Sequence, residues 1–485
     1  MKQKFLRWSG VLVASVLAVS AVSAQETNEV EQLRKEFREM RERMQSLEQK
    51  IGSIEAKPVA PVAVMSSVVN PAPTPVAPGG WKLTDPVRVS KGGAYMDASM
   101  VATFAAGGST ASDIEGGTQL GGHDPNQRGF TVQGAELNLQ GAVDPYFRGN
   151  ANIVFQLESG GESFIELEEA WLETTSLPGN LQIRAGQYLT EFGRINTQHP
   201  HTWGFVDAPL VSGRLLGGDG IRNPGVRLSW LVPTPFYSEL FFGVQNSQGE
   251  TAHSFRSDHG GEGFLGRIHD AGRVKTAGNM LYSARYAASF DVTDTQTLLV
   301  GASAALGSND SGADTDTQIY GVDVYWKWKP ANAHAGFPFV SWQTEAMLRK
   351  YQAGAFSEDL NGNLVLDTNE PDLNDDGLID SVPRETLTDW GAYSQLLYGF
   401  HPGWVAGLRG DYVTHTKLGA YEAVYGNDPE RATRWRISPN LTWYPTEFSK
   451  IRLQYNYDDR DGIGEDHSVW LQFEFLLGAH AAHKF

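Results

Sequence analysis

From about residue 94 onward, apolar and polar side chains alternate along the chain with a period of two residues. In segment 451–458 one face carries Ile451, Leu453, Tyr455 and Tyr457, and the other carries Arg452, Gln454, Asn456 and Asp458. Because successive side chains of an extended strand point to opposite sides, this pattern predicts strands with one apolar and one polar face. The same alternation recurs in segments 135–140, 151–158, 181–184, 435–443 and 469–475. In segment 165–173 the order slips at Glu169, which predicts a β-bulge or a misplaced strand boundary.

The connections between these segments fall into two length classes. Short joints lie at 144–145, 176–180, 233–235, 292–296, 329–336, 401–403 and 445–448. They alternate with mostly longer joints at 107–129, 159–163, 194–220, 246–278, 307–316, 353–386, 416–432 and 459–466. Outer-membrane barrels combine even strand numbers with short periplasmic turns and long extracellular loops. We therefore expect an all-β transmembrane barrel of about 16 antiparallel strands over residues 94–485.

The last stretch, 466–485, places Val469, Leu471, Phe473 and Phe475 on one face and Gln472 and Glu474 on the other, and ends on Phe485. It resembles the terminal strand of bacterial outer-membrane β-barrels. The resemblance implies that this strand pairs with the first strand of the same chain, because an open sheet edge is intolerable in lipid. Taken alone, the segment also fits an amphipathic edge strand of a soluble sandwich.

The composition excludes several classes of function for such a barrel. With 57 acidic against 39 basic side chains, a formal charge of −18, the chain lacks the basic footprint of a nucleic-acid-binding protein. The absence of cysteine excludes disulfides and thiolate metal sites. Sixteen strands enclose an aqueous lumen, which predicts passive diffusion of small polar solutes or ions rather than enzymatic activity.

The first 93 residues follow other patterns. Residues 1–24 combine basic residues, an apolar run and small residues before Gln25, which predicts a signal peptide. Residues 25–56 contain four heptads and predict a periplasmic coiled coil, whose narrow apolar seam favours self-association over packing on the barrel. The proline-rich segment 57–93 predicts an extended, semi-rigid linker.

The third outer loop is the candidate constriction of the pore. Its residues Arg194, His199, His201 and Asp207 could bind an anion or a metal ion, because histidines two apart beside a carboxylate can ligate Zn²⁺. Packing within the loop is the alternative interpretation. The same two alternatives apply to His480 and His483, which we expect at the periplasmic rim.

The side chains expected to face the lumen carry both signs of charge. They include Arg184, Arg409, Asp411, Arg436 and Arg452. Inward Glu136, Glu158 and Asp458 interleave with these arginines, so the pattern leaves anion preference, cation preference and neutral-solute passage open.

Two family resemblances accompany these patterns. The stretch 192–211, FGRINTQHPHTWGFVDAPLV, resembles bacterial barrels known as zinc-regulated outer-membrane proteins. The overall plan resembles the phosphate-selective porin O and P group with an added coiled coil, and general porins narrow their pores with the third loop. The resemblance implies a homotrimer embedded in the outer-membrane lipid of a Gram-negative-type bacterium. A TonB-dependent receptor does not fit, because the chain offers no plug and sixteen strands fall short of about 22.

The sixth outer loop contains an acidic repeat with the spacing of a calcium-binding loop. Oxygen-bearing side chains stand at positions 1, 3, 5, 9 and 12 of the first copy, namely Asp359, Asn361, Asn363, Asp367 and Glu370. A second copy carries Asp372, Asn374, Asp376 and Asp380. This spacing predicts weak extracellular Ca²⁺ binding, although Leu364 occupies the glycine position of the first copy and Pro383 the last position of the second. A solvated acidic loop is the alternative.

Two other functions remain open at this stage. The chain could be a structural envelope protein that tethers the outer membrane through its coiled coil. An outer-membrane hydrolase is the third alternative, but no Ser/His/Asp set can be placed on neighbouring strands.

Overall fold

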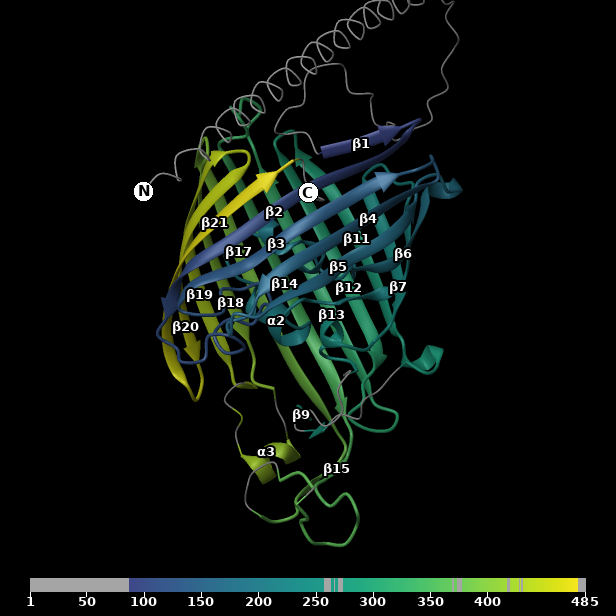
Figure 1. The fold of residues 1–485 in the computed structure, drawn as a ribbon, viewed down its shortest axis with the longest axis vertical. Coiled ribbons are helices and arrows are strands. Elements are labelled where there is room, and N and C mark those ends of the chain that lie inside the picture. The colour runs from purple at the N-terminus through teal and green to yellow at the C-terminus, as the bar shows by residue number, and fades with distance from the viewer. Residues whose placement is uncertain are drawn as a thin grey trace, which may run out of the picture. The chain divides into compact units, whose positions relative to one another are not determined.

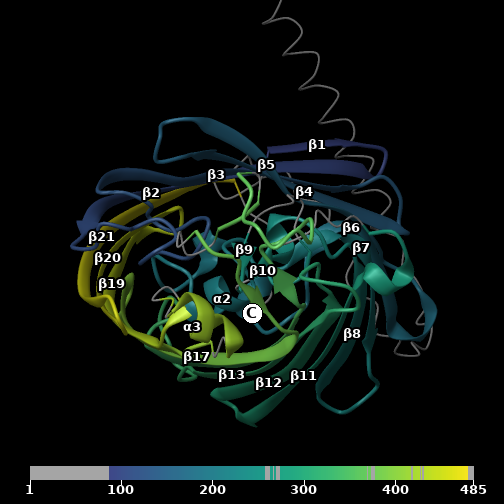
Figure 2. The same ribbon diagram turned by 90° about the horizontal axis from the view of Figure 1, so that it is seen from below.

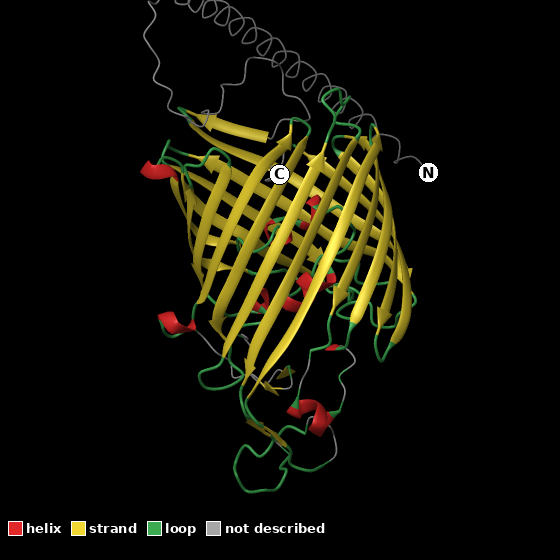
Figure 3. Ribbon diagram, turned by 180° about the vertical axis from the view of Figure 1, so that it is seen from behind, coloured by secondary structure: helices red, strands yellow, loops and turns green. Residues whose placement is uncertain are grey.

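The computed structural model describes residues 87–478 except 257–262, 266, 269–273, 369, 373–376, 417–418, 427 and 429–430. In this part of the chain, sixteen antiparallel strands form one closed β-barrel (Figure 1, Figure 3). The strands are β2 (Ala94–Ser109), β3 (Gly129–Ala142), β4 (Phe147–Leu157), β5 (Ser163–Thr174), β6 (Leu181–Leu189), β7 (Arg222–Leu231), β8 (Tyr237–Gln245), β11 (Leu281–Thr293), β12 (Gln296–Ser308), β13 (Asp316–Trp328), β14 (Phe339–Ala353), β17 (Glu385–His401), β18 (Trp404–Val413), β19 (Arg434–Thr446), β20 (Ser449–Arg460) and β21 (Gly464–Leu477). The predicted signal peptide, the coiled coil and linker residues 57–86 lie outside the described residues.

The barrel closes between its first and last strands. β2 pairs with β21 from Met100 opposite Leu477 to Ser109 opposite Ser468. This pairing confirms the expectation drawn from the last strand, and with it the predicted fold class.

The linker expected at 57–93 ends earlier than predicted. Residues Val87–Lys91 form strand β1, which pairs with residues 94–98 of β2. Residues 94–98 of β2 extend beyond the end of β21, which pairs with β2 only from Met100 onward, so β1 satisfies backbone groups that would otherwise lack a strand partner. Arg88 Nε donates to Asp97 Oδ1 at 2.6 Å and fixes the hairpin.

The two faces of the wall differ as the alternation predicts. On β20, Leu453 and Tyr455 are exposed on the outer face, whereas Arg452 and Gln454 are buried on the inner face. All eight predicted longer joints and all seven predicted short turns connect the strands of the barrel, with bounds within a few residues of those predicted. Among the described residues, no helix is long and apolar enough to cross a membrane.

A bulge in β5 moves two consecutive acidic side chains into the interior. Asn152 of β4 lies opposite Glu169, whereas the next residue, Ile153, lies opposite Leu167. Glu168 is therefore the extra residue, which confirms the predicted bulge. Both Glu168 and Glu169 are buried.

The remaining elements are short. They are the 3-10 helices η1 (Pro178–Asn180), η2 (Ile195–Thr197), η3 (Pro200–Thr202), η4 (Glu250–Ala252) and η5 (Ala277–Asn279), the helices α2 (Leu210–Leu215) and α3 (Ala420–Tyr425), and the strand pairs β9 (Gly263–Phe264) with β10 (Arg267–Ile268) and β15 (Phe356–Ser357) with β16 (Ser381–Val382).

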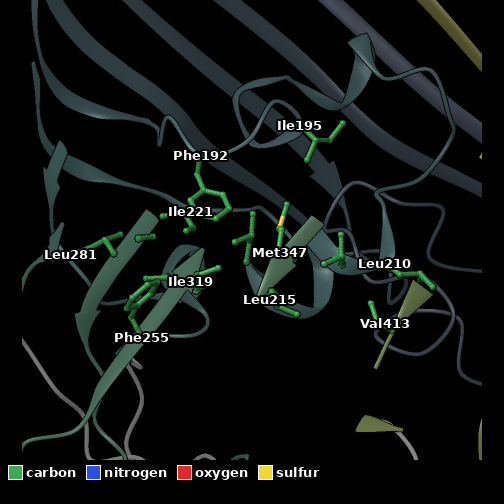
Figure 4. Packing of buried hydrophobic residues seen from close by; sticks show 14 of the residues in the cluster. Phe192, Ile195, Leu210, Leu215, Ile221, Phe255, Leu281, Ile319, Met347 and Val413 are labelled. Carbon is green, nitrogen blue, oxygen red and sulfur yellow. The ribbon is translucent and has the colours of Figure 1, made fainter. Parts of the chain in front are cut away.

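The third outer loop, residues 190–221, lies inside the barrel (Figure 2). It carries η2, η3 and α2, and α2 contacts β14, β17 and β18. Its apolar side chains join wall residues in a buried cluster that includes Phe192, Leu215, Ile319 and Met347 (Figure 4). We expected a water-filled lumen lined by polar side chains. At the level of this loop, part of the lumen is instead filled by this apolar cluster, in which inward-facing Ile319 and Met347 of the wall pack against the apolar residues of the loop.

Candidate constriction and ionic clusters of the lumen

The entry of the third outer loop is fixed by backbone contacts to the wall. The amide of Gly193 donates to Ser303 Oγ at 3.0 Å, and the amides of Arg194 and Ile195 donate to the Glu345 carboxylate at 2.9 and 2.8 Å. Gly193 has a φ of +58°, and a Cβ there would lie 2.1 Å from Glu345 Oε2. Only glycine fits this left-handed position so close to the carboxylate.

Asp207 is the buried centre of the loop's attachment. Its carboxylate accepts hydrogen bonds from Arg409, Arg436, Gln454 and Asn456, at 2.7, 3.0, 2.9 and 2.7 Å. Burial alone would raise the pKa of Asp207, but the two guanidiniums outweigh it and lower that pKa to about 2. The loop is thus held to β18, β19 and β20 by an ionised group.

Other inward side chains bind the backbone of the loop. Arg452 donates to the carbonyls of Phe205 and Trp203 at 2.9 and 2.8 Å, and Lys450 donates to that of His201 at 2.8 Å. Asp411 accepts from the amide of Leu210 at 3.1 Å. Positive and negative wall groups therefore satisfy loop carbonyls and amides that would otherwise be buried unpaired.

The predicted constriction residues do not form one site. Arg194 stacks on Tyr325, with its guanidinium carbon 4.0 Å from the ring centroid, and donates to Gln343 at 3.0 Å. Asp207 lies in the separate arginine network. Arg184, predicted to line the lumen, pairs with Glu173 and stacks on Trp171.

His199 and His201 lie together against β3 and β5. Their rings stack with centroids 5.7 Å apart. His199 Nδ1 lies 2.8 Å from Glu168 Oε2 and 3.6 Å from Glu136 Oε1, and His201 Nδ1 lies 2.9 Å from Glu136 Oε2. Burial lowers the pKa of His199, but the charges of Glu168 and Glu136 outweigh it and hold that pKa well above its ordinary value.

A second mixed cluster adjoins the first. His123 of the first outer loop, Glu166 of β5 and Asp219 of the third loop each place one potential ligand atom within 4.8 Å of the others. Arg222 pairs with Glu166 and so competes with any cation there.

The first and third outer loops meet at Asp124. Its carboxylate accepts from the amides of Gly121 and Ala208, both at 2.8 Å. Burial, with the negative charge of Asp207, raises the pKa of Asp124 to about 7.

A cavity of about 360 Å³ lies between α2 and the outer ends of β14, β19 and β20. Its charged lining is entirely basic in this part of the chain and consists of Arg214, Arg349, Arg431, Arg434 and Arg460, beside His253. Arg214 donates to the carbonyls of Thr414 and Ala432, which carry no formal charge. Burial and the neighbouring Arg434 and Arg349 lower the pKa of Arg214 to about 10. The other four arginines are paired with aspartates that do not line the cavity, namely Arg349 with Asp389, Arg431 with Asp428, Arg434 with Asp458, and Arg460 with Asp113 and Asp466.

The predicted calcium loop is folded around its own polar side chains. Asp359 Oδ1 accepts from the amides of Gly362 and Asn363 at 2.6 and 3.1 Å. The side-chain amides of Asn361 and Asn363 donate to Asp367 Oδ2 at 2.8 and 2.9 Å, and Glu370 Oε1 accepts from the amide of Asn361 at 3.1 Å. The polar side chains of the first copy therefore converge within one loop.

The described residues of the second copy make similar contacts to backbone amides. Asp372 accepts from the amide of Gly377 at 3.0 Å, and the amide of Asp380 donates to Glu358 at 2.8 Å. Asn374 and Asp376 lie outside the described residues, as do His480 and His483.

The sequence predicts Arg409, Asp411, Arg436 and Arg452 as lumen-facing residues, and these contact the loop, but it does not single out other residues of this region. Glu168 and Glu345 lie on strands, and Arg214, Arg349 and Arg434 line the cavity from the third loop and two strands. The only sequence signal for any of them was the slip at 168–169, which places two acidic residues inward.

Comparison with known proteins supports the architecture. No protein-family model matches the chain. An uncharacterized protein of Aquifex aeolicus is 31% identical over 389 residues, which cover 75% of this chain and 73% of that protein. The outer membrane channel DcaP of Acinetobacter baumannii has a TM-score of 0.51 at 13% identity, covering 79% of this chain and 97% of that one. The anion-selective porin from Comamonas acidovorans has a TM-score of 0.45 at 7% identity, covering 79% and 99%. The structural neighbours are thus bacterial outer-membrane porins and channels.

Proposed function

The chain belongs to the same family as the uncharacterized Aquifex aeolicus protein, and from this membership and its porin-like barrel we propose that it is an outer-membrane porin for small polar solutes or ions. The observation that carries the proposal is a third outer loop fastened inside a closed sixteen-strand barrel. A barrel of this size has room for an aqueous channel, and an inserted loop narrows it to a selective constriction. This arrangement supports a channel rather than an enzyme.

The solutes we propose are small anions. The support is the cavity beside α2, whose charged lining consists of arginines and one histidine. The carboxylates that pair with several of these arginines, such as Asp389 with Arg349, are not among the lining residues. The cavity therefore presents guanidinium groups to a solute even though the whole chain is acidic.

Planar-bilayer recording of the purified full-length protein tests this function. We expect discrete conductance steps and a reversal potential of anion-selective sign in a KCl gradient. An absence of steps at protein concentrations where a known porin inserts would refute the channel, and a cation-selective reversal potential would refute the anion preference alone.

We also propose a cellular location and an oligomeric state for the chain. We place the barrel in the outer membrane with the coiled coil of residues 25–56 in the periplasm, where its heptads would support a homotrimer like those of the porin O and P group. The resemblance of the third loop to zinc-regulated outer-membrane proteins is consistent with this plan. Cross-linking of the intact protein, with and without residues 25–80, tests the trimer. Loss of the trimer only in the shortened protein is the expected result.

The alternative of a structural envelope tether makes a different prediction for the same shortened protein. A porin without residues 25–80 keeps its single-channel conductance, because the loop and its wall contacts all lie within the barrel. If the chain is a tether instead, the shortened protein loses its envelope phenotype, and neither the full-length nor the shortened protein conducts ions.

The Ca²⁺ site at Asp359, Asn361, Asn363, Asp367 and Glu370 is a proposal of the same kind. It is supported by the convergence of these side chains in one turn of the sixth outer loop. Isothermal titration of the full-length protein should show Ca²⁺ heat that disappears in Asp359→Asn.

A further inference from the structure

We propose that Glu136, Glu168 and His199 bind one divalent transition-metal ion that fastens the third outer loop to the barrel wall. One potential ligand atom of each residue lies within 4.8 Å of the others, and all three side chains are buried. Glu136 belongs to β3, Glu168 to the bulge of β5 and His199 to the loop. An ion at this position would join three segments that are separate in sequence.

The distances suit a small cation. His199 Nδ1 lies 2.8 Å from Glu168 Oε2 and 3.6 Å from Glu136 Oε1. Ligand atoms about 2.0 to 2.1 Å from a tetrahedral Zn²⁺ lie about 3.4 Å apart, so the two distances from His199 differ by at most about 0.6 Å from those that the ion requires. The donors are imidazole nitrogen and carboxylate oxygen, a set that suits Zn²⁺ and related metals better than the all-oxygen ions Ca²⁺ and Mg²⁺.

Neighbouring groups hold the proposed ligands in place. His201 Nδ1 contacts Glu136 Oε2 at 2.9 Å and so orients the carboxylate whose other oxygen faces His199. Asn152 Nδ2 lies 2.9 Å from His199 Nε2, which fixes the ring. Such outer contacts are usual around metal-binding histidines and carboxylates. A cavity of about 30 Å³, lined by Glu136, Glu168 and His201, has room for a water ligand.

The charge around this cluster also favours a cation. Glu136, Glu168 and Glu169 bring three buried carboxylates to the two imidazoles. Arg222 pairs with Glu166 and Glu168 of β5, but of these two it hydrogen-bonds only Glu166, whereas its Nη1 lies 3.7 Å from Glu168 Oε1. Burying carboxylates is costly unless cations compensate them.

The adjacent cluster of His123, Glu166 and Asp219 provides an internal control. It also combines one imidazole with two carboxylates inside the same barrel. Arg222 hydrogen-bonds the Glu166 carboxylate, and Asp219 is partly exposed. We therefore expect this cluster to bind metal much more weakly than Glu136, Glu168 and His199 do.

The test uses the full-length protein in detergent after treatment with EDTA. Equilibrium dialysis against micromolar ZnCl₂, followed by elemental analysis, should give one Zn²⁺ per chain. His199→Asn and Glu168→Gln should each weaken binding by at least about tenfold, whereas His123→Asn should leave it unchanged. Zn²⁺ should raise the melting temperature of the wild type and not that of His199→Asn.

A further readout requires no variant. Co²⁺ added to the metal-free wild type should produce visible absorption bands of a four- or five-coordinate nitrogen and oxygen site, which excess Zn²⁺ removes. Failure to retain Zn²⁺ at micromolar concentration would overturn the proposal and leave only ion pairs between the histidines and glutamates. Loss of binding in His123→Asn with retention in His199→Asn would overturn it as well.

Discussion

Asp207 of the third outer loop and Arg409 of β18 form a buried ion pair, in which Arg409 Nη2 donates to Asp207 Oδ1 at 2.7 Å. The same arginine donates to the Asp207 carbonyl at 2.8 Å, so it holds both the side chain and the backbone of the loop. The two residues are 202 positions apart in sequence. This contact is the clearest single link between the loop and the wall.

Asp207→Asn should release this part of the loop. The substitution removes the anion that Arg409 and Arg436 share; because Arg409 keeps Asp411 and Arg436 keeps Asp458, the cost stays below the about 3 to 5 kcal/mol of a fully uncompensated buried charge. We expect a lower melting temperature in detergent and a higher single-channel conductance, because the loosened loop obstructs the lumen less.

Asp323→Asn is the matched control. It breaks a buried pair with Arg285 that joins two wall strands. It should lower the melting temperature without raising the conductance. Equal conductance changes in both variants would contradict the role given to Asp207.

The sequence predicts the barrel well but predicts the site only in part. Alternation and loop length are local properties, so strands such as β20 and the closing β21 can be recognised from their own residues. The partners of the third loop are not local. Arg194 is five residues from His199, yet it packs on Tyr325 of the opposite wall, whereas His199 meets Glu168 on the bulge of β5. The path of the loop across the lumen decides these contacts, and no period in the sequence encodes it.

The stability of the loop contacts should depend on pH through Asp124. Its pKa is raised to about 7, against about 3.9 in an unfolded chain. The folded state therefore holds this proton more tightly, and the resulting stabilisation is complete below about pH 4 and is lost as the pH rises through 7. The melting temperature should fall between pH 5 and 8.

Asp124→Asn should flatten the dependence of the melting temperature on pH, because the asparagine side chain does not titrate. The pKa of Asp207, about 2, adds nothing to the change in this range. Identical pH profiles for the wild type and Asp124→Asn would show that other groups cause any loss of stability.

Leu364→Gly should strengthen the proposed Ca²⁺ loop. Leu364 has a φ of +60° and occupies the position at which calcium loops use glycine. Glycine removes a left-handed strain of about 1 kcal/mol. Protection of the sixth outer loop from proteolysis should therefore need less Ca²⁺ in Leu364→Gly than in the wild type.

Leu360→Gly serves as the comparison, since Leu360 lies in the same loop without a positive φ. A cleavage rate independent of Ca²⁺ in every variant would exclude binding at this loop.

Arg431→Gln should weaken the anion preference. Arg431 lines the large basic cavity and pairs with Asp428, so its removal deletes a positive charge and leaves a negative one. The reversal potential in a KCl gradient should shift toward zero. Lys329→Gln removes the same charge from a short turn at the other end of the barrel and should leave the reversal potential unchanged.

The central claim is that the third outer loop, inside the lumen, controls passage through the barrel. The chain has no cysteine, so Arg214→Cys places a single thiol on this loop at the cavity wall. The most direct measurement is the single-channel current of this variant before and after a thiol-reactive methanethiosulfonate, with Lys329→Cys as the control. The structure predicts that modification sharply reduces the current of Arg214→Cys and leaves that of Lys329→Cys unchanged. An unchanged current in a fully modified Arg214→Cys channel would contradict the claim.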